Sequence, residues 1–165
     1  MATLNRIVPC LWFDDQAEAA AELYTSIFDN SKIVSTLHYT EVGREFHGKE
    51  PGTVMTVAFE LNGHPFTALN GGPVFQFNEA ISFEIHCQSQ EEVDYYWKRL
   101  SEGGNPAAQQ CGWLKDRFGV SWQVVPTALH EMLSDSDPEK VRRVSEVMLQ
   151  MKKLDVAALE RAYEG

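Results

Sequence analysis

The 165-residue sequence has little positive charge and little cysteine. Lysine and arginine number 14 against 24 aspartates and glutamates, so the net charge is −10 at pH 7. A chain with this charge repels the phosphates of nucleic acids and of anionic lipid surfaces, and we expect neither as a partner. The three cysteines include no CxxC pair and form no disulfide framework, which is typical of a reducing compartment.

Long apolar runs are also missing. The apolar stretch RIVPCLWF near the N-terminus ends at Asp14 and Asp15, which makes it too short for a membrane span or for a signal peptide with its cleavage site. We therefore expect a cytoplasmic protein with no membrane partner. Hydrophobic residues at 44% and charged residues at 23% are globular values, and the length corresponds to one ordinary domain.

The apolar pattern of the first half predicts a strand followed by an amphipathic helix. Residues 6–13 form a short apolar run, and apolar side chains then recur at helical spacing through Phe28. Asp15 and Glu18 have the spacing of a capping box, which marks a helix start. Further strands are expected at residues 32–40, 53–61 and 65–69, the last two joined by a turn at Asn62-Gly63.

The second half repeats this order. Residues 80–87 alternate as a strand does, Ser89 and Glu92 repeat the capping box, and Gly103-Gly104 ends the helix. From Asp15 to Ser89 the offset is 74 residues, which indicates an internal repeat. Two more strands are expected after the second helix, at residues 106–114 and 120–125.

The chain after Pro126 has a different pattern, which predicts a helical tail. Asp137-Pro138 is a good N-cap and first-turn pair, and a second short helix is expected from Asp155. The apolar face of this tail must be buried on the domain itself or on a second subunit, so we expect a homodimer formed through sheet edges and the tail. The predicted organisation is a first module at 1–75, a second module at 76–126 and a C-terminal extension at 127–165.

Four segments of the sequence point to a known family. They are VPCLWFDDQAEAAAELYTSIF, EEVDYYWKRLSEGG, LKDRFGVSWQVVP and DPEKVRRVSEVMLQMKKLDVAALERAY. Together they resemble the PhnB-like branch of the vicinal oxygen chelate superfamily, over essentially the whole chain. The resemblance implies an α+β fold of two βαβββ modules whose sheets curl around a cavity, which is the glyoxalase/bleomycin resistance/dihydroxybiphenyl dioxygenase fold.

The resemblance also implies where a divalent metal would bind. In the superfamily the ligands are typically His or Glu from the first and last strands of each module, and the corresponding residues here are Pro9, Thr67, Ser82 and Gln123. Proline has no side-chain donor, and the other three are weak neutral donors compared with imidazole or carboxylate. We therefore predict no metal cofactor at these positions.

Members of this branch are also described as 3-demethylubiquinone methyltransferases. Such an enzyme needs a site for its methyl donor. In this sequence no glycine-rich loop follows a strand in a βαβ setting where a nucleotide-like cofactor could bind. The pairs Gly71-Gly72 and Gly103-Gly104 indicate a turn and a helix end instead, so the residues do not support a ubiquinone-pathway methyltransferase.

Strand alternation predicts which side chains face the cavity. In the strand 80–87 these are Ser82, Glu84 and His86, because Phe83, Ile85 and Cys87 are apolar and pack on the helix. The cavity so built is apolar with a few polar groups, which is typical of a site for a small molecule. The predicted ligand-binding residues of the whole chain are Leu11, Phe13, Thr67, Ser82, Glu84 and Gln123.

Glu84 and His86 are the candidates for chemistry. Side chains two apart on a strand lie about 7 Å from each other, within reach of one ligand or water. The first interpretation places both in solvent at the end of the strand, and the second makes them a base or a metal anchor. His38, Glu41, Glu45 and His47 contain metal-binding groups but are expected to be solvated. The last three lie in the loop 41–52, for which a lid is the second interpretation.

The remaining thiols and imidazoles predict little chemistry. Cys10 and Cys87 are expected on the helix-facing sides of their strands as inert thiols, whereas Cys111 is the candidate for an exposed one. His64 and His130 have no partner in the sequence and are expected at the surface.

The resemblance, rather than a recognised site, implies metal-free binding of a small apolar or amphipathic molecule in the cavity. The alternative is a lyase, isomerase or dioxygenase that uses a divalent metal through Glu84, His86 or the loop histidines. A third possibility is a dimeric interaction module whose cavity is filled by its own side chains, which bulky residues such as Leu11 and Phe13 would favour.

Overall fold

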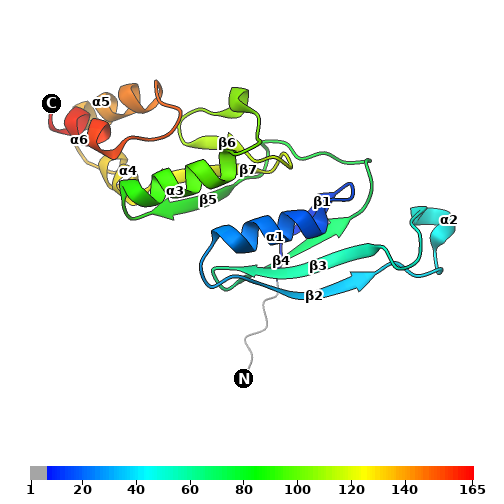
Figure 1. Cartoon of the computed structure of the whole chain (residues 1–165). Helices are drawn as coiled ribbons and strands as arrows, with labels where there is room; N and C mark the ends of the chain where they lie inside the picture. Colours follow the sequence, from blue (N-terminus) through cyan, green and yellow to red (C-terminus); the bar gives the residue numbers. More distant parts are fainter. Residues whose placement is uncertain (1–6) are drawn as a thin grey trace. The chain divides into compact units, whose positions relative to one another are not determined.

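The computed structural model describes residues 7–165, and the chain divides into two compact units, Met1–Gln76 and Phe77–Gly165 (Figure 1). Each unit has its own sheet with a helix packed on it, which confirms the α+β class. Arg6, the first residue of the predicted strand 6–13, lies outside the described residues. Between Ile7 and Gly165 the helices are too short or too polar to span a membrane.

The first unit has the predicted βαβββ order with one added helical turn. Its sheet has the strand order β1-β4-β3-β2, in which β1 runs parallel to β4 and the other neighbours are antiparallel. Figure 1 shows α1 along one face of this sheet and α2 beyond the hairpin of β2 and β3. The elements are β1 (Cys10–Phe13), α1 (Ala17–Ile27), β2 (Lys32–His38), α2 (Arg44–His47), β3 (Val54–Leu61) and β4 (His64–Asn70).

Helix α1 packs on its sheet through small side chains. Ala17, Ala20 and Ala21 are fully buried and allow the helix to approach β3 and β4 closely. Further along the helix, the ring of Tyr24 lies 6.3 Å from that of Phe59, and both rings are buried. This face of the sheet is therefore the core of the first unit.

The predicted cap of α1 at Asp15 is wrong. The N-cap residue is Gln16, whose side chain makes no capping hydrogen bond. The backbone N–H of Ala17 instead donates to the side-chain oxygen of Asn70, at 2.8 Å. A residue at the end of β4, far away in sequence, thus provides a hydrogen-bond acceptor for a backbone N–H of the first helical turn.

The second unit repeats the strand and helix but has a smaller sheet. Its strand order is β5-β7-β6, with β5 parallel to β7 and β6 antiparallel to it. The strand predicted at 106–114 is wrong over most of its length, because Pro106 begins a 3₁₀ turn whose N-cap is Asn105. The module is therefore βαββ, with β5 (Phe83–Cys87), α3 (Gln90–Ser101), η1 (Pro106–Ala108), β6 (Trp113–Lys115) and β7 (Ser121–Pro126).

Both ends of α3 agree with the prediction. The Ser89 hydroxyl accepts a hydrogen bond from the backbone N–H of Glu92, at 3.3 Å. At the other end Gly103 has a φ of +76°, which favours glycine. A Cβ atom on Gly104 would lie 2.0 Å from the carbonyl oxygen of Lys115, so only glycine allows this approach to β6.

The motif DRFGVSWQ forms the turn between β6 and β7 and the beginning of β7. Its aspartate, Asp116, is buried, and the carboxylate accepts hydrogen bonds from the backbone N–H groups of Phe118 and Val120, at 2.9 and 3.0 Å. The indole of Trp122 donates a third, at 2.9 Å. The carboxylate therefore fixes the start of β7, the strand that positions several candidate site residues.

The C-terminal tail folds as three helices, α4 (Thr127–Leu133), α5 (Pro138–Met148) and α6 (Val156–Glu164). The predicted caps Asp137 and Asp155 are confirmed, because each accepts a hydrogen bond from the first turn of its helix. Helix α4 was not predicted, since it follows β7 directly without a side-chain cap. The helices share a buried apolar cluster with the end of β7, made of Val125, Leu129, Met132, Val144, Leu154 and Leu159.

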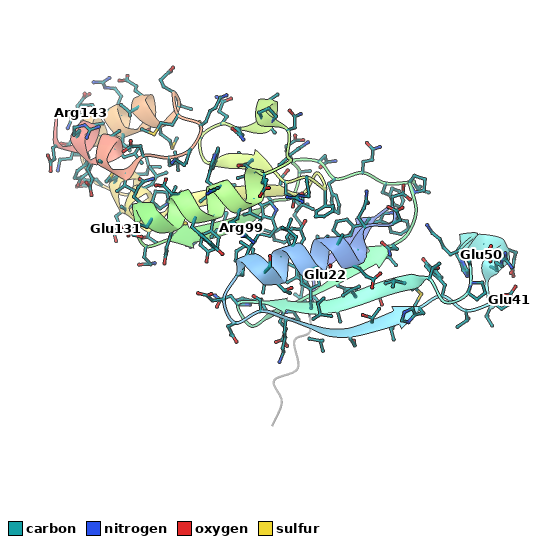
Figure 2. The ribbon with its side chains drawn as sticks, viewed as in Figure 1. Glu22, Glu41, Glu50, Arg99, Glu131 and Arg143 are labelled. Carbon is teal, nitrogen blue, oxygen red and sulfur yellow. The ribbon has the colours of Figure 1, made fainter. Side chains whose placement is uncertain are left out.

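Hydrogen bonds also join the tail helices to one another. Arg143 of α5, labelled in Figure 2, donates to the carbonyl oxygens of Ala162 and Tyr163, both at 2.8 Å. These are among the last carbonyls of α6, which have no partner within that helix. The tail therefore packs within its own chain, on β7 and between its own helices.

Acid is expected to weaken the packing of the tail. The Tyr163 hydroxyl donates to Asp135, and this hydrogen bond, followed by one from the Asp137 backbone, holds the pKa of Asp135 below its ordinary value. Because the pKa is lower in the folded state, this stabilisation is complete at neutral pH and is lost as pH falls through the folded-state pKa. Tyr163→Phe should thus lower the melting temperature at neutral pH and change it less at about pH 2. Melting followed by circular dichroism tests this, and an equal loss at both pH values would contradict it.

Candidate functional site on the second sheet

One row of side chains crosses the face of the second sheet that is opposite α3. The register pairs Glu84 of β5 with Gln123 of β7, and Gln123 with Trp113 of β6. Paired residues share a face, so a carboxylate, an amide and an indole lie side by side. Trp122 and Val124 of β7 point to the opposite face, where α3 packs, and both are buried. The predicted faces of β5 and β7 are confirmed.

The Gln123 amide is oriented by Ser82. Its nitrogen donates to the Ser82 hydroxyl at 2.9 Å. Among residues 7–165 this is the one side-chain hydrogen bond of Gln123, so its carbonyl oxygen and second N–H are available to a ligand. Gln123 and Trp113 are half-buried and Glu84 is exposed, so the row is accessible from solvent.

These contacts test whether the superfamily's metal fits this chain. The Gln123 amide donates a hydrogen bond to the Ser82 hydroxyl. In the first unit the carbonyl oxygen of Pro9 accepts a hydrogen bond from the backbone N–H of Thr67, at 2.9 Å. None of the four residues offers an imidazole or a carboxylate. The donor set therefore does not fit a divalent metal at the superfamily's ligand positions.

Ser121 adds a buried hydroxyl to the same face of β7. It is 2% exposed, and its side-chain oxygen has no hydrogen-bond partner in the described part of the chain. An unpaired buried hydroxyl costs about 1–3 kcal/mol. On the same strand Val125 lies in the buried tail cluster, so the tail covers the far end of this face.

The prediction that Leu11 and Phe13 face the cavity is wrong. The register pairs Leu11 with Ala68 and Phe13 with Asn70, and the Asn70 side chain bonds to the start of α1. Leu11 and Phe13 are 6% and 2% exposed, so they belong to the core under the helix. The strand β1 is apolar on both faces, and alternation therefore could not tell one face from the other.

The open face of the first sheet contains Cys10, Trp12 and Thr67 instead. Cys10 pairs with Thr67 across β1 and β4, and it is exposed, so its predicted burial is wrong. The Trp12 indole donates to the carbonyl oxygen of Gly72 at 2.9 Å, and its ring packs edge-on against Phe75 at 5.0 Å. These contacts hold Trp12 at the end of the sheet.

Cys87 should be the least reactive thiol of the protein. It is buried as predicted, and burial, followed by the charge of Glu92, raises its pKa to about 12. The thiolate is the reactive form, so we expect iodoacetamide to alkylate the exposed Cys10 and the half-buried Cys111 before Cys87. Peptide mass spectrometry of the native protein tests this order. Alkylation of Cys87 at the rate of Cys10 would contradict it.

Glu84 and His86 form a cluster with His130 at the carboxyl end of β5. The His86 Nε2 atom lies 3.1 Å from a carboxylate oxygen of Glu84, and the His86 and His130 rings are 5.2 Å apart. One ligand atom from each of the three residues lies within 4.8 Å of the others. All three are exposed, which agrees with the first interpretation of Glu84 and His86 and with the expected surface position of His130, but their grouping was not predicted. Since β5 and β7 are parallel, the helix after β7 begins at the sheet edge where His86 lies. This topology is the signal from which the grouping of His130 with Glu84 and His86 could have been predicted.

The loop residues considered as metal ligands do not form such a cluster in residues 7–165. Arg44 forms ion pairs with Glu41 and Glu50, which Figure 2 labels near α2. The His47 ring accepts a hydrogen bond from the Lys49 backbone at 3.0 Å. Glu41, Glu50 and His47 therefore have partners within the loop.

The fold and the comparisons define a class of protein. Two compact units, each with a helix on one face of a small mixed sheet, give the α+β fold expected from the sequence, and a solved PhnB protein structure is similar to it. A family model described as 3-demethylubiquinone-9 3-methyltransferase matches residues 5–125, and the chain belongs to this PhnB family. The resemblance found in the sequence is confirmed. Helices α4–α6, and with them His130, lie beyond the matched residues.

Solved structures are similar to this chain to different degrees. A putative 3-demethylubiquinone-9 3-methyltransferase, PhnB protein, from Bacillus cereus is 34% identical over 74% of this chain and 100% of its own, with a TM-score of 0.63. Protein PA1353 from Pseudomonas aeruginosa is 21% identical over 74% and 98%, with a TM-score of 0.55. The fosfomycin resistance protein FosX from Listeria monocytogenes is 18% identical over 78% and 98%, with a TM-score of 0.47. Comparison with the curated proteins finds no match.

Proposed function

We propose that this protein binds a small apolar or amphipathic organic molecule on the row of Glu84, Gln123 and Trp113, without a metal at the superfamily's ligand positions. The observation that carries the proposal is the hydrogen bond from Gln123 to Ser82. It orients a neutral amide where the superfamily has metal ligands. The amide keeps one donor and one acceptor for a ligand.

The neighbours of Gln123 favour a particular kind of ligand. The half-buried indole of Trp113 offers a flat apolar surface for stacking. Glu84 accepts hydrogen bonds, and the net charge of −10 disfavours anions. A flat aromatic molecule, neutral or cationic, with one donor and one acceptor group therefore fits this row.

Thermal-shift measurements test this binding. The untagged protein, with EDTA present, is melted with neutral naphthols, indoles and aromatic amines. A ligand at 100 times its dissociation constant adds about 2.7 kcal/mol of stability, so a true ligand should raise the melting temperature clearly. Gln123→Leu should remove most of the shift, whereas Gln150→Leu, at an exposed position in the tail, should keep it. No shift with any compound, or an equal shift in Gln123→Leu, would refute the proposal.

A divalent-metal-dependent lyase, isomerase or dioxygenase is the second candidate function. The grouping of Glu84 and His86 with His130 favours it, since these residues supply the imidazole and carboxylate donors that the superfamily positions lack. Turnover that is lost with EDTA and restored by metal would distinguish it from metal-free binding. The methyl transfer in the family's description would need a binding site for the methyl donor. The two glycine pairs offer no support for one, because Gly71 packs closely against Trp12 and Gly104 against Lys115.

The homodimer is part of this proposal, through an edge of the first sheet. Strand β2 is an edge strand, and its apolar side chains Ile33, Val34 and Leu37 are exposed. An exposed apolar edge is a template for pairing with a second chain. Light scattering coupled to size exclusion should give a dimer for the wild type and a monomer for Val34→Lys. A monomeric wild type would refute this part.

A further inference from the structure

We propose that Glu84, His86 and His130 bind one divalent transition-metal ion, at a place separate from the superfamily's metal positions. Two imidazoles and one carboxylate are a donor set that zinc enzymes and non-haem iron enzymes use. The site combines a strand within the family's matched region with a helix outside it. The inference does not depend on the binding of an organic ligand.

The spacing of Glu84 and His86 already suits a shared metal. Ligand atoms bound at about 2.1 Å to one ion lie about 3.0 Å apart at a right angle and about 3.4 Å apart at the tetrahedral angle. The observed distance between the Glu84 oxygen and the His86 nitrogen is 3.1 Å. Both residues are on β5, paired with the central strand β7, so their backbone positions are fixed.

His130 supplies the third donor from a well-anchored helix. Its neighbours Leu129 and Met132 are buried in the tail cluster, which fixes the backbone of α4 beside the sheet edge. The His130 side chain itself is exposed, and its ring lies edge-on to that of His86. Its ligand atom lies within 4.8 Å of the other two, so a small rotation brings it to chelating distance.

The exposure of the cluster predicts an exchangeable ion. The side chains of Glu84 and His86 are 46% and 54% exposed, so water reaches the site. Three protein donors leave at least one coordination position open, as in catalytic rather than structural zinc sites. Zinc, nickel and cobalt suit imidazole donors better than magnesium or calcium does. Occupancy would link β5 to α4 and raise the melting temperature, because the ion binds the folded state.

Titration with the metal alone tests the site. The protein is purified without an affinity tag, stripped with EDTA and dialysed, and then titrated with CoCl₂ in a calorimeter and a visible spectrometer. The wild type should bind one cobalt ion per chain with a ligand-field absorption band. Loss of groups that only support metal ligands costs about 10–100-fold in affinity, so His130→Gln and Glu84→Gln should each weaken binding at least about tenfold.

His64→Gln is the matched control, because His64 is an exposed histidine of the first unit. It should bind cobalt as the wild type does. All the replaced side chains are exposed, so the metal-free variants should melt at the wild-type temperature. A wild type that binds no cobalt, or His130→Gln and Glu84→Gln that bind it unchanged, would overturn the inference. No organic ligand is present, so this result is independent of the thermal-shift screen.

Discussion

Replacing Asp116 with alanine should destabilise the protein by at least about 3 kcal/mol. The buried carboxylate accepts hydrogen bonds from Phe118, Val120 and Trp122, and the change removes the acceptor of all three. Hydrogen bonds to a charged group contribute about 1.5–3 kcal/mol each, and a buried donor that loses its partner keeps its desolvation cost. The turn between β6 and β7 would lose its main constraint. Urea denaturation measures the loss.

Asp116→Asn separates the hydrogen bonds from the shape of the side chain. One oxygen accepts from both backbone N–H groups, and asparagine keeps such an oxygen. Its NH₂ group would face the Trp122 indole, which is a second donor, so the loss should be smaller than for alanine but clear. Asp29→Ala, at an exposed position, should change stability by less than about 0.5 kcal/mol. Equal stability of Asp116→Ala and wild type would contradict this role.

Leu154→Ala should cost about 2–5 kcal/mol, the range for a buried leucine. Leu154 is fully buried in the tail cluster, and its side chain packs against Gly112. Backbone hydrogen bonds join the same regions, because the N–H groups of Cys111 and Gly112 donate to Met151 and Lys152, both at 2.8 Å. Loss of this side chain would therefore weaken the attachment of the tail to the rest of the second unit.

Leu149→Ala is the matched control within the tail. Leu149 is 54% exposed, so its truncation should cost less than about 0.5 kcal/mol. Both variants are compared with the wild type by urea denaturation with circular dichroism. If Leu154→Ala and Leu149→Ala lowered the free energy of unfolding by the same small amount, the tail would not belong to the cooperative core.

Alternation predicted the fold well where the two faces of a strand differ. In β5, Phe83 and Ile85 are apolar and Glu84 and His86 are polar, so the face toward α3 could be read directly. In β1, both faces are apolar, and Leu11 was assigned to the wrong one. The sequence therefore places a strand more reliably than it orients one that is apolar throughout.

The features that the sequence analysis missed depend on contacts between distant residues. Asn70 caps α1 from the end of β4, and no local spacing reveals that bond. His130 meets His86 only because β5 and β7 are parallel neighbours. Glu84 and His86 could be found as a pair, since residues two apart on a strand share a face. The third donor of their cluster required the topology of the sheet.

Diffraction at the cobalt edge tests most directly where this protein binds a metal and where it does not. Crystals grown from the cobalt-loaded protein are measured for anomalous scattering. The predicted result is one peak among Glu84, His86 and His130 and no peak beside Ser82 and Gln123, which hydrogen-bond to each other. A peak at Ser82 and Gln123 would contradict metal-free binding at the superfamily's positions.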